Sequence, residues 1–189
     1  MKIKLQKLND IETNQYIPIK CTTSFPEAYY ADILGVMDET SLQFISKKLQ
    51  IHTLYFYMRF HYFIEENVTS YCQEQDLPIH WLGEGDGYKF ARIDIDSIQK
   101  FNKCFFLIDI ITERMEDVTL FSVSDNLVVP SGESLITDGR FFITESSKKE
   151  RITLLISEDV HGTFRLMSND PMYTPKSLQE TLGELVFFV

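Results

Sequence analysis

The C-terminal third of the sequence contains three short strand-like runs, with turn signals inside the first run and between the runs. The runs are LITDGRFFIT (135–144), RITLLIS (151–157) and TFRLMS (163–168). Asp138-Gly139 in the first run is typical of a two-residue type I′ turn, which needs positive φ. In the second and third runs, alternation with a period of two places the apolar side chains on one face. We therefore expect an antiparallel meander with one buried face.

A second hairpin is expected around LGEGDG (82–87), in which three glycines alternate with Glu84 and Asp86. IHWL (79–82) and YKFARIDI (88–95) flank this stretch and have the composition of strands. A dinucleotide loop needs G-x-G-x-x-G before a helix, and a P-loop needs Gly-Lys-Ser/Thr. Calcium needs about six to eight oxygen ligands. Because the stretch meets none of these requirements and its carboxylates would repel phosphate, the sequence favours a simple turn.

Helical periodicity is clearest over 52–75, where residues recur at steps of three and four: Leu54, Tyr57, His61, Ile64, Val68 and Tyr71. A further helix start is expected at 38–41. DSIQ (96–99) matches a capping box with Asp96 as N-cap, and 104–111 fits either a helix or a strand. Thr174 and Pro175 fit the N-cap and first position of a last helix.

These elements predict one α+β domain over residues 1–189, with an antiparallel sheet packed against several helices. The meander and the central hairpin form the sheet. Residues 1–8 alternate lysine with apolar residues, which suits an edge strand. The expected subdivisions are a helix-rich 38–76, a β-rich 79–168 and a C-terminal helix over 175–186.

Three widely spaced cysteines, Cys21, Cys72 and Cys104, provide neither a disulfide framework nor a metal-binding motif. The N-terminus lacks the apolar stretch of a signal peptide, and no apolar run approaches the roughly 18 residues of a membrane span. We therefore expect a soluble cytoplasmic protein with buried free thiols, no metal and no cofactor.

Negative charge is concentrated in the middle of the chain. The net charge is −10, and residues 65–117 hold twelve acidic and five basic residues, so this segment carries 5 − 12 = −7. An acidic segment disfavours nucleic acid and anionic membranes, which attract lysine and arginine. It favours a basic protein partner.

Candidate catalytic residues are few, and each has a plain structural interpretation. His80, beside Trp81, is the best candidate for a general base, although a histidine in that position is commonly a packing residue. Asp94-x-Asp96 resembles a metal-binding D-x-D, although a solvated strand face has the same pattern. His61 and Glu65 are spaced as two helix-borne metal ligands, but no HExxH or H-x-H motif accompanies them.

Charge and the lack of a catalytic motif favour a non-catalytic acidic protein-binding module, such as an inhibitor, an antitoxin or an immunity-type protein that covers a basic partner. One alternative is a small metal-assisted or hydrolytic enzyme that uses His80, Asp94 and Asp96. A second alternative is a structural subunit of an assembly, and the oligomeric state is left open. The expected binding residues are Glu65, Glu66, Trp81, Glu84, Asp86, Tyr88, Asp94 and Asp96.

Overall fold

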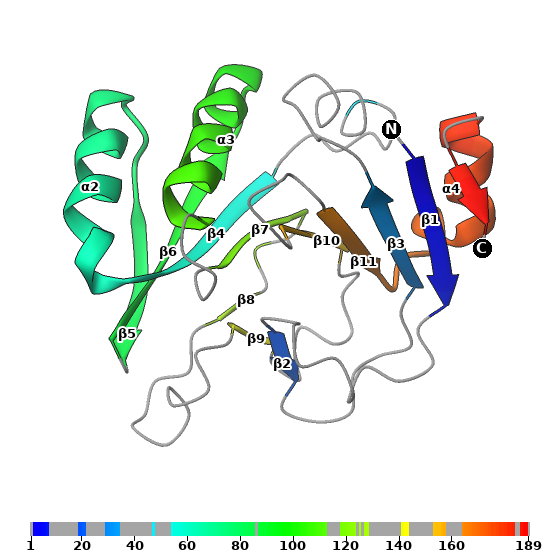
Figure 1. Cartoon of the computed structure of the whole chain (residues 1–189), viewed down its shortest axis with the longest axis horizontal. Coiled ribbons are helices and arrows are strands. Elements are labelled where there is room, and N and C mark those ends of the chain that lie inside the picture. The colour runs from blue at the N-terminus through cyan, green and yellow to red at the C-terminus, as the bar shows by residue number, and fades with distance from the viewer. Residues whose placement is uncertain are drawn as a thin grey trace.

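Most of the described strands belong to one large sheet in the computed structural model of the chain (Figure 1). The structure describes residues 2–7, 19–21, 29–34, 47, 54–85, 87–112, 118–123, 125, 127–128, 141–143, 153–157, 164–183 and 186–188. Within these residues the sheet has nine strands in the order β12-β1-β3-β11-β10-β7-β4-β6-β5. Every neighbouring pair is antiparallel except β1 and β12, which are parallel.

The strands of the large sheet are short and come from the whole length of the chain. They are β1 (Lys2–Lys7), β3 (Tyr29–Leu34), β4 (Leu54–His61), β5 (His80–Gly85), β6 (Tyr88–Ile95), β7 (Val118–Ser122), β10 (Thr153–Ser157), β11 (Phe164–Ser168) and β12 (Val186–Phe188). A smaller sheet has the order β2-β9-β8 and consists of β2 (Ile19–Cys21), β9 (Phe141–Ile143) and β8 (Leu127–Val128).

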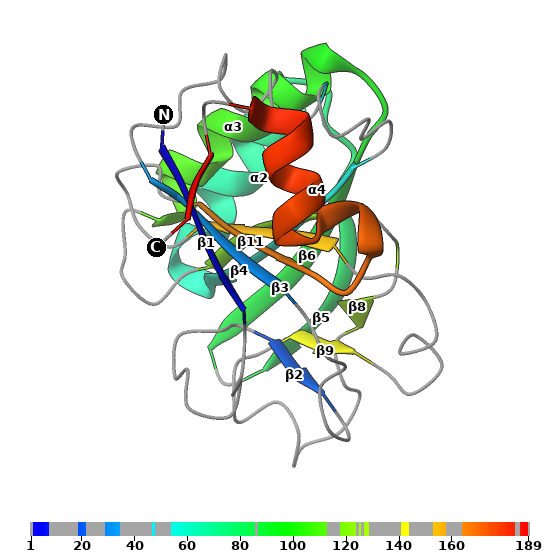
Figure 2. The same cartoon turned by 90° about the vertical axis from the view of Figure 1, so that its right-hand side faces the viewer.

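Helices cover one face of the large sheet, and the small sheet lies on the opposite side (Figure 2). The helical elements are η1 (Tyr62–Ile64), α2 (Glu65–Glu74), α3 (Ile98–Thr112), η4 (Pro171–Tyr173) and α4 (Pro175–Leu182). Helices α2 and α3 lie side by side, and α4 lies near β1 and β3. This arrangement confirms the expected α+β class, with a mainly antiparallel sheet packed against helices.

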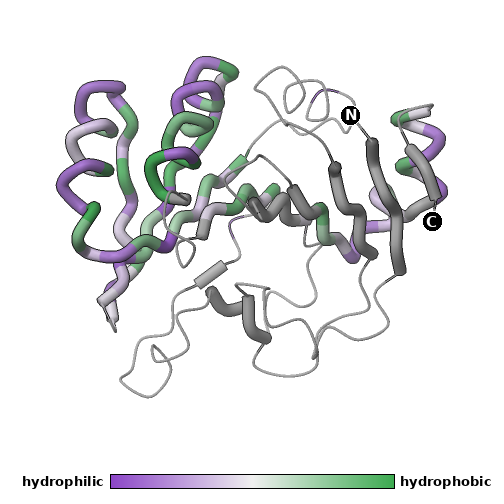
Figure 3. The backbone as a smooth tube through the Cα atoms, in the orientation of Figure 1, coloured by the Kyte–Doolittle hydropathy of each residue, from purple (hydrophilic) through white to green (hydrophobic). Residues whose placement is uncertain are grey.

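The core is centred on β4, which pairs with β6 on one side and β7 on the other. Phe56, Met58 and Phe60 of this strand are fully buried and belong to the cluster that α2 and α3 cover. The helices contribute Val68, Cys72, Cys104, Leu107 and Ile111. In Figure 3 hydrophobic colour is concentrated in α3 and the strands beneath it, whereas α2 is largely hydrophilic.

The helix expected over 52–75 is wrong in its first half, because residues 54–61 form β4. Aromatic residues favour a strand, and a strand buried on both faces has no clean alternation of apolar and polar residues. Tyr57 on the other face of β4 is as fully buried as Phe56. The second half is correct, since α2 begins at Glu65, and Glu65 and Glu66 therefore lie in its favourable first turn.

Segment 104–111 is helical and belongs to α3. Buried residues recur along it at steps of three and four, as expected for a helix packed on a sheet: Cys104, Leu107, Ile108 and Ile111. The N-cap is one residue later than expected, because Ser97 Oγ accepts a hydrogen bond from the Lys100 amide at 3.3 Å. Asp96 pairs instead with the Lys100 side chain at 2.9 Å.

The C-terminal helix starts as expected but ends early. Thr174 Oγ1 accepts a hydrogen bond from the Ser177 amide at 3.3 Å, and Pro175 occupies the first turn. Gly183 has a φ of 61°, which ends α4 at Leu182 rather than at residue 186. The chain then forms β12, which pairs with β1. Strand β1 is therefore not at the edge of the sheet, contrary to the expectation.

The C-terminal meander is present as the β10–β11 hairpin, with Thr153 opposite Ser168 and Ser157 opposite Phe164. Strand β9 does not continue this meander, because it pairs with β2 and β8 in the small sheet. The Asp138-Gly139 turn and the helix start at 38–41 lie outside the described residues.

The buried thiol of Cys72 makes folding sensitive to alkaline pH. Burial raises its pKa to about 12, whereas a cysteine in an unfolded chain has a pKa of about 8.5. Folding therefore favours the protonated thiol. Its contribution is complete below about pH 8.5 and is lost as the pH rises towards the folded pKa.

We expect the free energy of unfolding of the wild type to fall by about 2 kcal/mol more than that of Cys72→Ala between pH 8 and pH 10. Urea unfolding of both proteins at the two pH values measures this difference. The variant is the control for every other group that titrates in this range. Parallel pH profiles would contradict the burial of the thiol.

Candidate functional site

The β5–β6 hairpin forms one end of the large sheet, and its strands pair from His80 opposite Arg92 to Gly85 opposite Tyr88. A bulge lies between Trp81 and Gly83. Strand β5 extends to Gly85, so the glycine-rich stretch is strand for most of its length. Gly87 in the turn has a φ of 83°, a conformation that favours glycine. The predicted hairpin is confirmed. Asp86 lies outside the described residues.

The turn rests against an aromatic cluster that we call the ring cluster, composed of His61, Tyr62, Phe63 and Tyr88. The carbonyl of Gly87 accepts a hydrogen bond of 2.9 Å from the Tyr62 amide. Neighbouring ring centroids in the cluster are 4.1 to 5.5 Å apart. Tyr62 and Phe63 are nevertheless 49% and 62% exposed. Large rings that are both mutually packed and exposed are typical of contact surfaces.

His61 orders the cluster through its position at the junction of β4 and η1. Its Nδ1 accepts a hydrogen bond from the Phe63 amide at 3.4 Å and so caps the first turn of η1. Its ring stacks on that of Phe63, with centroids 4.3 Å apart. His61 ends β4 and Glu65 begins α2, so the two residues do not lie on one helix as the sequence spacing suggested. The contacts of His61 instead give it a structural role at the junction of β4 and η1.

Trp81 lies on the edge strand and is 47% exposed. Its ring centroid is 6.2 Å from that of the buried Phe60, so one part of the indole covers the core and the other faces solvent. Tyr88, the second expected aromatic anchor, is less exposed and carries the Arg59 guanidinium over its ring at 4.8 Å.

Lys89 joins two of the expected acidic residues. Its ammonium group pairs with Glu84 across the hairpin and lies 3.5 Å from Glu65 of α2. The hydrogen bond to Glu84 is the main cause of the raised pKa of Lys89. One lysine therefore offsets part of the charge of two exposed carboxylates and ties α2 to the hairpin.

Arg92 is the centre of a polar network on the sheet face opposite the helices. Its Nε lies 2.8 Å from Asp94 Oδ1, and its Nη1 pairs with Asp125, which also accepts a 3.4 Å hydrogen bond from Tyr57. His80 Nε2 lies 3.7 Å from Asp94 Oδ2. Burial lowers the pKa of Arg92, but Tyr57 and the two carboxylates outweigh burial and raise it overall.

The two carboxylates of the Asp94-x-Asp96 pattern have different partners. Asp94 belongs to the Arg92 network, whereas Asp96 precedes α3 and pairs with Lys100. The hydrogen bond from Lys100 lowers the pKa of Asp96. Among the described residues, no group of three or more histidine, cysteine or carboxylate side chains could hold a metal ion.

Glu66 differs from the other expected acidic residues that the structure describes. It lies on the exposed side of α2 and, within the described part of the chain, has no ion-pair partner. Glu65, Glu84, Asp94 and Asp96 each have a cationic partner. The structure therefore brings Glu65, Glu84 and Trp81 to the helix side of the hairpin, and Asp94 to the other side.

Sequence reasoning missed Tyr62, Phe63 and Arg92 as surface-defining residues. The helical period assigns Tyr62 and Phe63 to a buried helix, although the appearance of Glu65-Glu66 just after the aromatic run is typical of a helix start. Arg92 gave no signal of its own, because two of its partners, Asp125 and Tyr55, come from distant parts of the chain.

No protein-family model, curated protein or solved structure matches this chain. Within the described residues, no helix has the length and apolarity needed to cross a membrane. The surface itself is therefore the basis for assigning a function.

Gly87→Ala tests the contact between the turn and the ring cluster. A Cβ on Gly87 would lie 3.2 Å from His61 Nε2, and the positive φ would strain any other residue. We expect a loss of about 2–3 kcal/mol in the wild type and about 1–2 kcal/mol in a His61→Ala background, where only the backbone strain remains. Urea unfolding of the four proteins measures both losses. Equal losses would show that the His61 ring does not constrain the turn.

Proposed function

We propose that this chain is a non-catalytic protein-binding module that covers a basic protein. The observation that carries the proposal is the group of exposed aromatic side chains at the β5–β6 end of the molecule: Tyr62, Phe63 and Trp81. Aromatic residues are enriched among the residues that dominate binding energy at protein interfaces. Packing within the ring cluster limits the conformational entropy that binding would remove.

Charge supports a basic partner. The excess of acidic residues in 65–117 gives this part of the molecule a negative potential, even though several carboxylates are paired. A negative field speeds the encounter with a positive protein and discourages acidic ones. An inhibitor, an antitoxin or an immunity-type protein directed against a basic enzyme would use such a surface, and we propose this class for the chain.

Capture from the native cell tests the module. Tagged wild type should retain a basic protein at stoichiometric level, with less retained at high salt because steering is screened. Tyr62→Ser combined with Phe63→Ser should lower retention at least about tenfold, equivalent to about 1.4 kcal/mol. Quantitative mass spectrometry at two salt concentrations measures both effects.

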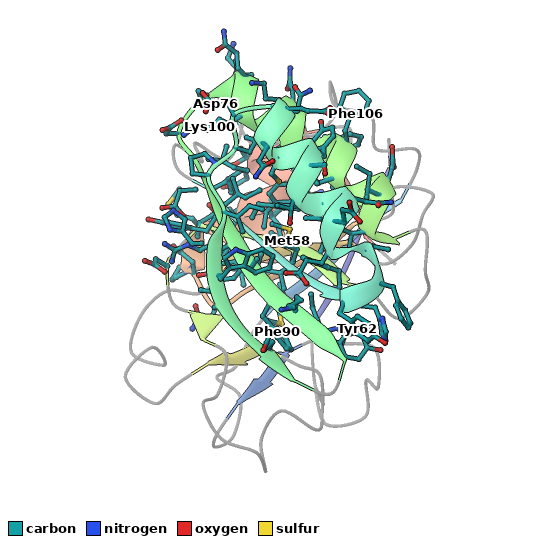
Figure 4. All side chains as sticks on the ribbon, turned by 90° about the vertical axis from the view of Figure 1, so that its left-hand side faces the viewer. Met58, Tyr62, Asp76, Phe90, Lys100 and Phe106 are labelled. Atoms are coloured by element: carbon teal, nitrogen blue, oxygen red, sulfur yellow. The ribbon has the colours of Figure 1, made fainter. Side chains whose placement is uncertain are left out.

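Phe106→Ser is the matched control for this capture. Phe106 is 58% exposed but lies on α3, at the opposite end of the helix pair from Tyr62 (Figure 4). Its substitution should leave retention unchanged. Equal retention by all three proteins, each with the circular dichroism spectrum of the wild type, would reject this surface as the contact site.

A hydrolytic or metal-assisted enzyme is the second candidate, and the proximity of His80 to Asp94 favours it. Asp94 Oδ2 lies 3.7 Å from His80 Nε2, and a histidine beside a carboxylate is an arrangement that general-base catalysis uses. Asp96, which pairs with Lys100, is not part of this arrangement.

For the enzyme, zinc, manganese or a small ligand should raise the melting temperature of the wild type by several degrees, and Asp94→Asn should abolish the increase. A thermal-shift screen with both proteins gives the measurement, and Asp96→Asn is the control that keeps the increase. Equal melting temperatures with and without every metal and ligand would reject this candidate.

A further inference from the structure

The exposed side of η1 and α2 forms a continuous stripe that starts with aromatic rings and continues with polar and acidic side chains. Exposed positions along this segment recur at steps of three and four, so they share one face. We call this face the aromatic-acidic stripe, and its members are Tyr62, Phe63, Glu66, Asn67, Ser70, Gln73 and Glu74. The stripe is part of the contact surface of the binding module, so a ligand assigned to it rests on that proposed function.

The charge of the stripe is of one sign. Residues 62–76 contain four acidic residues and no lysine or arginine, a net charge of 0 − 4 = −4. Lys89 contacts Glu65 from β6, which partly offsets the first of these charges. Glu66 is three residues from Phe63 and four from Tyr62, a spacing at which helical side chains are neighbours, and all three residues are exposed. A cation placed on the rings would therefore lie close to the negative charge of this segment.

The molecule already packs arginine against rings of this kind. The Arg59 guanidinium lies 4.8 Å from the centroid of Tyr88, which is a member of the ring cluster. The Arg92 guanidinium lies 5.2 Å from the centroid of Tyr55 on the neighbouring strand. The electron-rich faces of aromatic rings attract guanidinium, and a nearby carboxylate adds to the attraction.

We propose that an arginine side chain of the basic partner stacks on the exposed rings of Tyr62 and Phe63, with Glu66 as its counter-ion. Arginine fits better than lysine, because its planar guanidinium stacks on a ring while its edge donates hydrogen bonds to a carboxylate. Lysine is a compact, strongly hydrated charge that gains less from stacking.

Titration with a blocked tripeptide isolates this contact from the rest of the interface. The probe is acetyl-Gly-Arg-Gly-amide, added to the ¹⁵N-labelled full chain. The same peptide with citrulline is the neutral control, because citrulline keeps the shape of arginine without the charge. The arginine peptide should produce saturable shifts of the Tyr62, Phe63 and Glu66 amides, and the citrulline peptide should produce none.

Variants should weaken binding in a specific pattern. Phe63→Ser and Glu66→Gln should each raise the dissociation constant about two- to fivefold, as expected for one exposed cation–π or charge contact. Two control variants, Phe106→Ser and Glu74→Gln, should leave the dissociation constant unchanged. Glu74 lies on the same stripe but far from the rings. Amide shifts spread over all the acidic residues of α2, or equal amide shifts with the citrulline peptide, would overturn the arginine assignment.

The peptide titration and the capture experiment fail independently. Loss of the captured partner in the Tyr62/Phe63 variant, without arginine-selective shifts in the titration, rejects the arginine contact and retains the binding module. Arginine-selective shifts at the rings, together with equal capture by all variants, would show that the rings bind arginine but would reject this face, and with it the stacked arginine, as the contact of the cellular partner.

Discussion

Packing of β4 against α2 and α3 is the interaction on which the rest of the structure depends. Phe56, Met58 and Phe60 fill the space between the sheet and the two helices, and the strand has a partner on both sides. Burying three large apolar side chains stabilises the fold by several kcal/mol, roughly 1.5–3 kcal/mol for each. The same strand ends at His61, so its position also determines where η1, α2 and the ring cluster begin.

The candidate surface results from this arrangement. Because β4 ends at His61, Tyr62 and Phe63 leave the core, and the Tyr62 amide donates a hydrogen bond to the Gly87 carbonyl in the turn of the β5–β6 hairpin. Lys89 connects the hairpin to α2, while Arg92 holds the opposite sheet face through Asp94 and Asp125. Exposed ion pairs of this type contribute little to stability. Their effect on the surface is to reduce the local charge at Glu65, Glu84 and Asp94, while Glu66 stays an exposed charge on α2.

Local signals in the sequence predicted the elements that depend on nearest neighbours. Gly87 and its flanking strands specified the hairpin, Thr174 and Pro175 specified the start of α4, and alternation specified β10 and β11. The α+β class followed from these elements together. Three- and four-residue steps were misleading at 54–61, because aromatic residues on both faces of a buried strand satisfy a helical period by coincidence. For the site, Trp81, Glu84 and Glu66 were identified as surface residues, whereas Tyr62 and Phe63 were placed within the expected helix and not identified as a contact surface.

Sequence by itself determined the turn, the caps, the net charge and the supply of aromatic side chains, since each depends on residue type or on short spacing. Tertiary structure alone decided that β4 is the buried central strand, that β12 completes the sheet beside β1, and that Lys89 and Arg92 offset carboxylates of other elements. These features depend on strand order and register, which join residues far apart in the chain. A periodicity within one segment carries no information about which distant segment will cover it.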